Sequence, residues 1–399
     1  MKPTPLRRAA QGVFDTARAF LATKELKPGE AIPDGTPGAA RQALRELGII
    51  DGGGVAQWGI ALREGDLLAY SAGAPLEEAR AIPIPETAES ILVLKAGAGQ
   101  TALAASRRAR EVVAVEPSPR LRELLEFHLR LNGVLNVTVR PGVADGARYE
   151  LIVIPNVEQE SLEATLKVAG SGEKPQIRTV EKAMPHLAEN GVLIAAAHVC
   201  WSAEGKAESQ VRRWFSAASH CAVALYETRK FSTVELAVAQ LRGQQAAMTL
   251  EDCWGRLADA DAESASRGVL MVRRAAAPSF QRFRMADPAD VEAMERSFAW
   301  TGGVDLLSLR PRLGAHWRIR SPWRMREGQF QAGIESIVTE RPFVADFPFP
   351  LWVKALLLLV DGECTVREMV ATLEPAGVSR EKVLHGLRLL GSYEVILAG

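Results

Sequence analysis

Residues 89–116 constrain the fold more than any other stretch, because a buried strand, a glycine turn and a helix follow one another there. Residues 91–94 form a short apolar run, which is typical of a strand buried on both faces of a parallel sheet. Gly97 and Gly99 follow its carboxyl end, where they allow a tight turn and let a ligand approach the backbone. Residues 101–108 then predict a helix. The stretch therefore predicts an α/β fold with a ligand site at this turn.

The next predicted strand, residues 112–115, ends in an acid. In nucleotide-binding α/β folds a carboxylate at this place accepts hydrogen bonds from the two hydroxyls of an adenosine ribose, and this is the role predicted for Glu116. Two classes of cofactor compete for such a site. The spacing Gly97-x-Gly99-x-x-Ala102 also satisfies the dinucleotide fingerprint, in which a small third residue permits close packing of the helix on the strand.

The downstream sequence favours an adenosine-containing cofactor that is not a dinucleotide. Residues 121–131 predict an amphipathic helix that ends in Asn132-Gly133, and further strands are predicted at 134–139 and 149–154. This pattern resembles the class I S-adenosylmethionine-dependent methyltransferases, in particular the group with Asn-Gly after the third helix and Asn-Pro-Pro after the fourth strand. Members of that group methylate ribosomal RNA bases or glutamine side chains. The resemblance covers roughly residues 86–276.

The resemblance implies that the cofactor is S-adenosylmethionine. The glycines would contact it through their backbone, Glu116 would bind its ribose, and Asp145 would reach the adenine amino group. Gln100 and Thr101, at the start of the helix, are assigned to the cofactor carboxylate. The complete set assigned to the cofactor is Lys95, Ala96, Gly97, Gly99, Gln100, Thr101, Glu116, Asp145 and Pro155.

Two of these roles have a structural alternative. Asp145 lies in the loop Gly142-Val143-Ala144-Asp145-Gly146, where an aspartate is as well suited to form a turn as to bind a ligand. Glu116 is alternatively a surface acid at the end of a strand.

The match departs from the family pattern at two places. Val93 stands where the first motif has an acid, and Lys95 stands where it has a glycine, so that the lysine either pairs with the cofactor carboxylate or blocks the pocket. The family's Asn-Pro-Pro holds a planar amino group for methylation, but this chain has Pro155-Asn156-Val157. Asn156 is the candidate catalytic residue, although it is displaced by one position, which is evidence against amino-group transfer of the family type.

Three functions remain open. The first is an active S-adenosylmethionine-dependent methyltransferase, whose acceptor is an RNA base, a protein or peptide side chain, or a small metabolite. The second is a catalytically inactive methyltransferase-like protein that serves as a binding or partner subunit. The third is a nicotinamide-dependent enzyme, which the missing catalytic tyrosine-lysine or histidine pattern disfavours. Intact Gly97, Gly99 and Glu116 favour the first.

The order of elements predicts the α/β fold class, with a Rossmann-like, seven-stranded methyltransferase core. Residues 222–226 and 231–239 are expected as its two late antiparallel strands, and 268–272 as a further short strand. The expected parts of the chain are a small α+β, winged-helix-like N-terminal domain at 1–80, the core at 86–276, an Arg/Trp-rich connector at 277–330 and a C-terminal winged-helix-like domain at 331–399.

Residues 310–326 are rich in arginine and tryptophan and contain no acid. Arginine forks grip phosphates and tryptophan faces stack on bases, so RNA contact is one interpretation of this segment. The other, which we favour, is an edge strand pair with alternating charges and a packed tryptophan.

Composition excludes little else. The net charge of zero at pH 7 gives no global electrostatic case for binding nucleic acid or an anionic membrane. No apolar run is long enough to span a bilayer, residues 1–8 lack a hydrophobic signal segment, and the four cysteines are far apart, so a cytoplasmic protein is expected. No metal site is expected, because the nearby His and Cys residues lack the spacing of a zinc motif. A homodimer or a partner protein bound through the terminal domains stays open.

Overall fold

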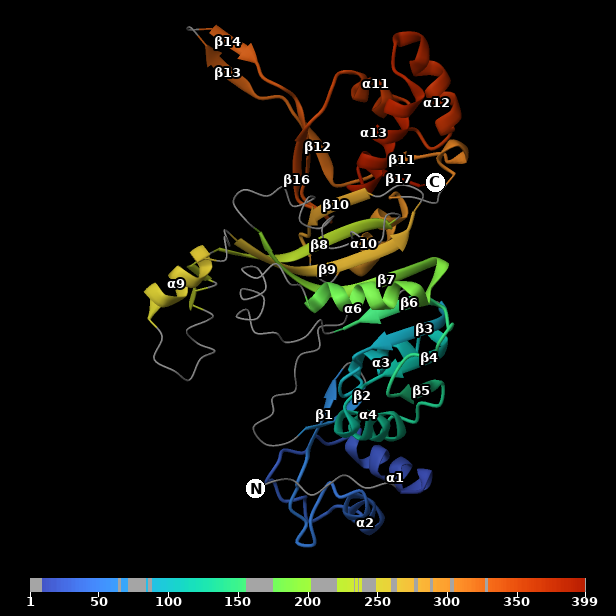
Figure 1. Ribbon diagram of the computed structural model, residues 1–399, viewed down its shortest axis with the longest axis vertical. Helices are drawn as coiled ribbons and strands as arrows, with labels where there is room; N and C mark the ends of the chain where they lie inside the picture. The colour runs from blue at the N-terminus through green and yellow to red at the C-terminus, as the bar shows by residue number, and fades with distance from the viewer. Residues whose placement is uncertain are drawn as a thin grey trace. The chain divides into compact units, whose positions relative to one another are not determined.

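The computed structural model describes residues 9–63, 66–70, 84, 88–155, 175–201, 221–232, 234–235, 237–238, 249–259, 264–275, 279–287, 290–301, 305–326 and 329–398. The chain divides into two compact units. The first is formed by residues 1–156 with 186–191, and the second by 157–185 with 192–399. Figure 1 labels most of the helices and strands of both units.

The first unit begins with two helices and a hairpin. Helix α1 (Gln11–Leu21) packs against α2 (Gly38–Glu46), and strand β1 (Gly59–Arg63) pairs antiparallel with β2 (Asp66–Tyr70). Helix α2 ends just before Gly48, which has a φ of +74°, the left-handed conformation that commonly ends helices. The helices and the hairpin agree with the α+β pattern read from the sequence, and the winged-helix assignment itself stays a prediction.

The four parallel strands of the first unit carry the predicted ligand turn. They are β3 (Ala88–Leu94), β4 (Ala109–Val115), β5 (Val137–Arg140) and β6 (Tyr149–Ile154), joined in part by the helices α3 (Gln100–Ser106) and α4 (Pro119–Leu131). The strands pair in the order β6-β3-β4-β5. The chain runs outward from β3 to β5 and then returns to the other side of β3. The carboxyl end of β3 is therefore a topological switch point, the place where open α/β sheets bind ligands.

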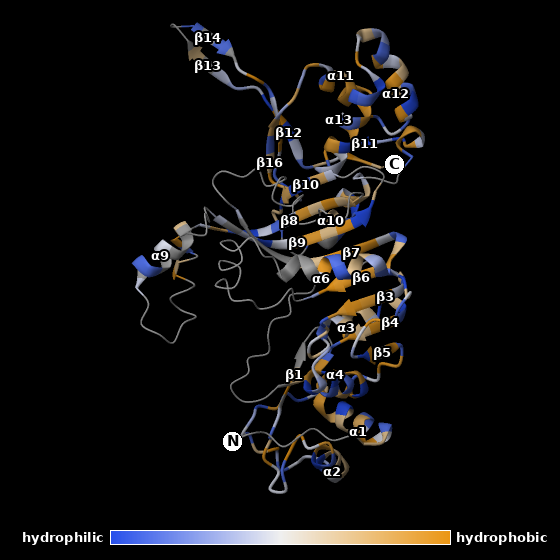
Figure 2. Ribbon diagram, viewed as in Figure 1, coloured by the Kyte–Doolittle hydropathy of each residue, from blue (hydrophilic) through white to orange (hydrophobic). Residues whose placement is uncertain are grey.

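Burial explains why these segments form strands. Ile91, Leu92 and Val93 are fully buried, as expected for a central strand covered on both faces. Figure 2 shows β3 and its neighbours in the apolar colours. The core of the N-terminal helices also includes Phe127 and Leu131 of α4, so α4 packs on both parts of the first unit.

The second unit holds the late strands. They are β7 (Leu187–Trp201, which begins in the first unit), β8 (Cys221–Ser232), β9 (Ser264–Arg274) and β10 (Ser279–Arg284). β9 pairs antiparallel with both β7 and β8, and β10 pairs parallel with β8. The strand order of the eight-stranded sheet is β10-β8-β9-β7-β6-β3-β4-β5. This mixed sheet with its helices is the α/β, Rossmann-like core predicted from the sequence.

Three details of that prediction differ from the structure. The second late strand is residues 264–274 rather than 231–239, because Phe231 belongs to the end of β8 and residues 234–235 and 237–238 have helical backbone. The short strand expected at 268–272 is the middle of β9. The sheet also gains an eighth strand, β10, within the segment predicted to be a connector.

The described helices between and after these strands are α6 (Pro175–Ala183), α9 (Leu250–Asp259) and α10 (Val291–Ala299). The rest of the second unit consists of β11 (Arg312–Leu313), β12 (Trp317–Arg320), β13 (Trp323–Arg326), β14 (Gln329–Ala332), β15 (Ser336–Thr339), β16 (Ala345–Pro348), α11 (Trp352–Leu358), α12 (Val366–Leu373), α13 (Arg380–Ser392) and β17 (Ile396–Leu397). Short 3-10 turns lie at Met184–His186, Leu306–Ser308 and Glu374–Ala376.

Side-chain N-caps fix the starts of two C-terminal helices. Thr365 caps α12 in a full capping box with Glu368, and the Ser379 side chain accepts a hydrogen bond from the Lys382 N–H at the start of α13. These helices enclose a separate apolar core, to which Ile337 of β15 and Ile396 of β17 contribute.

The arginine-rich segment contains paired strands. β12 pairs antiparallel with β15, Arg318 forms an ion pair with Glu340 at 2.7 Å, and Arg320 forms one with Asp346. Trp317 packs against the C-terminal core, whereas Trp323 is 65% exposed. Neighbouring acids thus balance part of the positive charge, which agrees with the strand-pair interpretation. RNA contact stays a prediction.

In the described part of the chain, no helix has the length and apolar character needed to cross a membrane. Within the same ranges, no three His, Cys, Asp or Glu side chains gather as metal ligands would.

Candidate functional site

The loop between β3 and α3 has three residues in the left-handed conformation. Lys95 has a φ of +51°, Gly97 of +56° and Gly99 of +99°. Ala96 N–H donates to the Val115 carbonyl at 3.0 Å, which ties the loop to the end of β4. A side chain in this conformation is disfavoured by roughly 1–2 kcal/mol, so the backbone keeps a shape that suits glycine even though position 95 holds a lysine. Strain of this kind is common at ligand sites.

The two glycines are needed for different reasons. A Cβ added to Gly99 would lie 2.2 Å from Leu125 Cδ1, so Gly99 is required by the close packing of α4 on the loop. A Cβ added to Gly97 would meet no atom within 4 Å. The space beside Gly97 is therefore open to a ligand, which is what a glycine in a cofactor turn should provide.

Glu116 contacts the loop directly and is not a surface acid. It follows β4, is 6% exposed, and its Oε2 accepts a hydrogen bond from Gly97 N–H at 2.9 Å. Its Oε1 accepts one from Ser118 N–H, also at 2.9 Å. The structure thus joins two residues that the sequence assigned to one site. The carboxylate stabilises the loop, and each oxygen keeps a further lone pair for a ligand hydroxyl.

His128 on α4 also contacts the glycine loop, a role that was not predicted from the sequence. The side chain is 1% exposed; its Nδ1 lies 2.7 Å from the Ala98 carbonyl, and its Nε2 accepts from Ala69 N–H at 2.9 Å. The ring must carry its proton on Nδ1 to satisfy both contacts. Burial lowers the pKa of His128 from 6.5 to about 4, against the opposing effect of the two backbone hydrogen bonds, so the ring is neutral at pH 7.

Asn132, one turn after His128, fastens the same helix to the hairpin. Its Oδ1 accepts from Leu67 N–H at 2.9 Å, and its Nδ2 donates to the Leu67 and His128 carbonyls at 3.0 and 2.8 Å. The Asn-Gly pair that ends this helix therefore has a structural role here. Gly133 follows with a φ of +70°, as a helix stop requires. The signal that the sequence did offer was a histidine and an asparagine four residues apart on one helix.

The other predicted residues lie as follows. Ala96 is buried, Gln100 and Thr101 begin α3 and are partly buried, and Pro155 directly follows β6, the neighbour of β3. Asp145 is exposed in a turn with Gly146, whose φ is +73°, which agrees with the turn-forming alternative. In the described ranges no hydrogen bond joins Asp145 to the glycine loop. Asn156, the candidate catalytic residue, lies outside the described residues.

The described residues fit an adenosine-type ligand in part. Gly97 offers open space beside its backbone, Glu116 offers carboxylate oxygens, and Lys95 supplies a cation at the same strand end. Glu116 is only 6% exposed, which limits the access of ligand hydroxyl groups to its oxygens.

No family model matches the chain, and no curated protein matches it. The solved structures that resemble about half of the chain include methyltransferases. One is M. jannaschii TYW2 in complex with AdoMet, at 12% identity over 54% of this chain and 86% of that chain, with a TM-score of 0.34. Another is a SAM-dependent methyltransferase from Geobacter sulfurreducens in complex with S-adenosyl-L-homocysteine, at 12% identity over 48% and 86%, with a TM-score of 0.29.

A third is the ribosomal protein L11 methylase from Lactobacillus delbrueckii subsp. bulgaricus, at 16% identity over 47% of this chain and 70% of that chain, with a TM-score of 0.26. The fold assignment itself rests on the sheet topology of the chain, which has the mixed sheet and the late antiparallel strands implied by the class I methyltransferase resemblance.

Proposed function

We propose that the chain is a methyltransferase that binds S-adenosylmethionine at the loop formed by Lys95, Ala96, Gly97 and Gly99. The observation that carries the proposal is the geometry of Gly97. This residue is left-handed, has open space on its Cα side and donates its N–H to Glu116, at the switch point of the sheet. A buried acid and an open glycine at adjacent strand ends suit a ribose beside a backbone turn.

The residues present would divide the work as follows. Gly97 would contact the cofactor through its backbone, Glu116 would accept its ribose hydroxyls, and Lys95 would pair with its carboxylate. When bound, the sulfonium group supplies an activated methyl group. The protein's share is then to orient the acceptor in line with that methyl group, so no acid-base triad is needed.

The acceptor in this proposal is an RNA base, a protein or peptide side chain, or a small metabolite. We also propose the division of the chain predicted from the sequence. It consists of an N-terminal domain at 1–80, the methyltransferase core at 86–276, a connector at 277–330 and a C-terminal domain at 331–399. The terminal parts are the candidate surfaces for a homodimer or a partner protein, and the cytoplasm is the compartment that suits the sparse cysteines.

Two observations favour a second function, that of a catalytically inactive methyltransferase-like protein. Both oxygens of Glu116 already accept backbone hydrogen bonds, and Lys95 occupies a position where the family has glycine. Both observations suit a methyltransferase-like protein that has lost catalysis and serves as a binding or partner subunit.

Isothermal titration of the full chain with S-adenosylmethionine, S-adenosylhomocysteine and NAD tests the proposal, after the protein is checked for co-purified ligand. We expect micromolar binding of the first two compounds and none of NAD. Labelled methyl transfer to RNA, protein and metabolite fractions then separates the two functions. Binding without transfer would favour the inactive protein, and no binding of either sulfur compound would rule out the cofactor site.

A further inference from the structure

A cavity of about 570 Å³ lies in the second unit, apart from the glycine loop. Its walls come from α10, from the segment after β10 and from the turn between β11 and β12. The segment between β15 and β16, a residue just before β17 and β17 itself complete them. Backbone hydrogen bonds hold these walls together, because Ala286 N–H donates to the Pro342 carbonyl at 2.8 Å and Gly314 N–H to the Val395 carbonyl at 2.9 Å. The volume is in the range of small-molecule sites.

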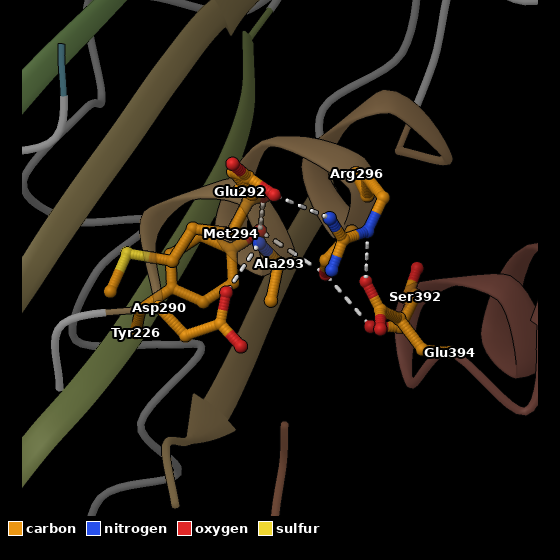
Figure 3. Close-up of polar contacts among 9 residues, drawn as sticks. Tyr226, Asp290, Glu292, Ala293, Met294, Arg296, Ser392 and Glu394 are labelled. Atoms are coloured by element: carbon orange, nitrogen blue, oxygen red, sulfur yellow. Dashed lines mark hydrogen bonds and ion pairs between the residues drawn. The ribbon is translucent and has the colours of Figure 1, made fainter. Parts of the chain in front are cut away.

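Glu394 occupies the wall of this cavity in a disfavoured conformation. It follows α13 with a φ of +54°, where glycine is the usual residue, and its side chain is 12% exposed. Arg296 Nε donates to Glu394 Oε1 at 2.6 Å (Figure 3). A Cβ added to Gly314 would lie 2.0 Å from the Glu394 carbonyl oxygen, so the backbone is held as closely as the side chain. The carboxylate is thus fixed in position, at a cost in strain that a purely structural helix end would avoid with glycine.

The charges of the cavity are only partly balanced. Arg296 is committed to Glu394 and to Glu292, and Asp290 Oδ1 accepts the Ala293 N–H at the start of α10. Figure 3 shows these contacts. Arg341 and His316 line the same cavity, and neither has a hydrogen bond or ion pair within the described ranges. Within the same ranges, no hydrogen bond reaches the second carboxylate oxygen of Asp290 or of Glu394.

From this arrangement we propose that the cavity binds a free α-amino acid. The carboxylate of the ligand pairs with the Arg341 guanidinium and the His316 ring, and its ammonium group donates to Glu394 and Asp290. Arginine matches a carboxylate in a bidentate manner, and an ammonium group is the natural partner for fixed carboxylates. A polyphosphate or nucleotide is disfavoured, because Asp287, Asp290 and Glu394 would repel it. This site does not depend on methyl transfer. Because S-adenosylmethionine itself carries an α-ammonium and a carboxylate, its titration is repeated with Arg341→Gln, which removes a cavity contact and leaves the glycine loop unchanged.

The test uses the full chain and the twenty common L-amino acids as individual probes, in millimolar thermal-shift titrations followed by calorimetry. The best binder is then compared with its analogue lacking the amino group and its analogue lacking the carboxyl group. We expect both analogues to bind at least about tenfold more weakly than the amino acid, since each loses a charge-assisted contact. No binding of any amino acid, or equal binding of the analogue without the amino group, overturns the proposal.

Variants locate the site. Arg341→Gln and Asp290→Asn should each weaken binding at least about tenfold, and asparagine keeps the helix cap, so the fold is preserved. Arg380→Gln removes an exposed arginine at the start of α13 and serves as the matched control with unchanged affinity. Binding that survives both cavity variants would place the ligand elsewhere and would overturn the assignment.

Discussion

At the scale of single residues, the two glycines of the loop should respond differently to the same substitution. Gly99→Ala adds left-handed strain and a clash with Leu125, so stability should fall by roughly 2–5 kcal/mol. Gly97→Ala meets no atom, so only the strain of about 1–2 kcal/mol applies, while the added methyl group enters the proposed ligand space. Denaturant unfolding of both variants measures the loss of stability, and cofactor titration measures the effect of the added methyl group on binding. Equal losses of stability would contradict the assigned difference.

Lys95→Gly separates the two roles considered for the lysine. The change relieves left-handed strain, and we expect the free energy of unfolding to rise by roughly 0.5–1 kcal/mol. Affinity for S-adenosylmethionine should fall if Lys95 pairs with the cofactor carboxylate, as proposed, and rise if the side chain blocks the pocket. Calorimetry decides between them, and an unchanged affinity would remove Lys95 from the site.

Glu116→Ala should reduce both stability and cofactor binding. The variant loses the hydrogen bonds from Gly97 and Ser118 to a buried carboxylate, so unfolding should be easier by at least about 2 kcal/mol. Loss of the ribose contacts should weaken binding by about 1.5–3 kcal/mol. Glu123→Ala, on the exposed side of α4, is the control. If the Glu116 variant loses stability but a folded preparation binds normally, the acid is only structural.

At the scale of elements, α4 makes stability depend on pH through His128. The folded protein holds the pKa of this ring at about 4 against 6.5 in the unfolded chain, so the unfolded state takes up its proton first as the pH falls. The stability is fully present above pH 6.5, falls by about 2 kcal/mol at pH 5 and levels off below pH 4. Urea unfolding of the wild type and His128→Gln at pH 7 and pH 5 measures this contribution. The same pH dependence in both proteins would contradict it.

The sequence predicted elements well where the apolar pattern was strong. The strands on either side of the glycine turn lie where the sequence placed them. The stretch from Phe231 resembled a strand because its apolar residues alternate, but part of it has helical backbone. Strand β10 was missed because four of the six residues in its sequence, Ser279-Phe280-Gln281-Arg282-Phe283-Arg284, are polar, as suits an edge strand.

At the scale of the whole molecule, contacts between residues far apart along the chain could not be predicted from the sequence. His128 binds Ala69 and Ala98, which are 59 and 30 residues away, and no local pattern indicates such partners. The burial of Glu116 and the cavity around Glu394 likewise depend on segments that meet only in the folded chain. The glycine loop and its acid were predictable because their chemistry lies in one short stretch.

The contacts of α4 also limit which insertions this helix can tolerate. Leu125, His128 and Asn132 follow one another at intervals of three and four residues, so a single side of the helix contacts the glycine loop and the hairpin. One residue inserted between Leu125 and Asn132 would rotate the helix beyond the insertion by about 100°, so the contacts on its two sides could no longer form together. The spacing of these three residues is therefore fixed by their contacts, while exposed positions of the helix such as Glu123 and Arg130 are free to vary.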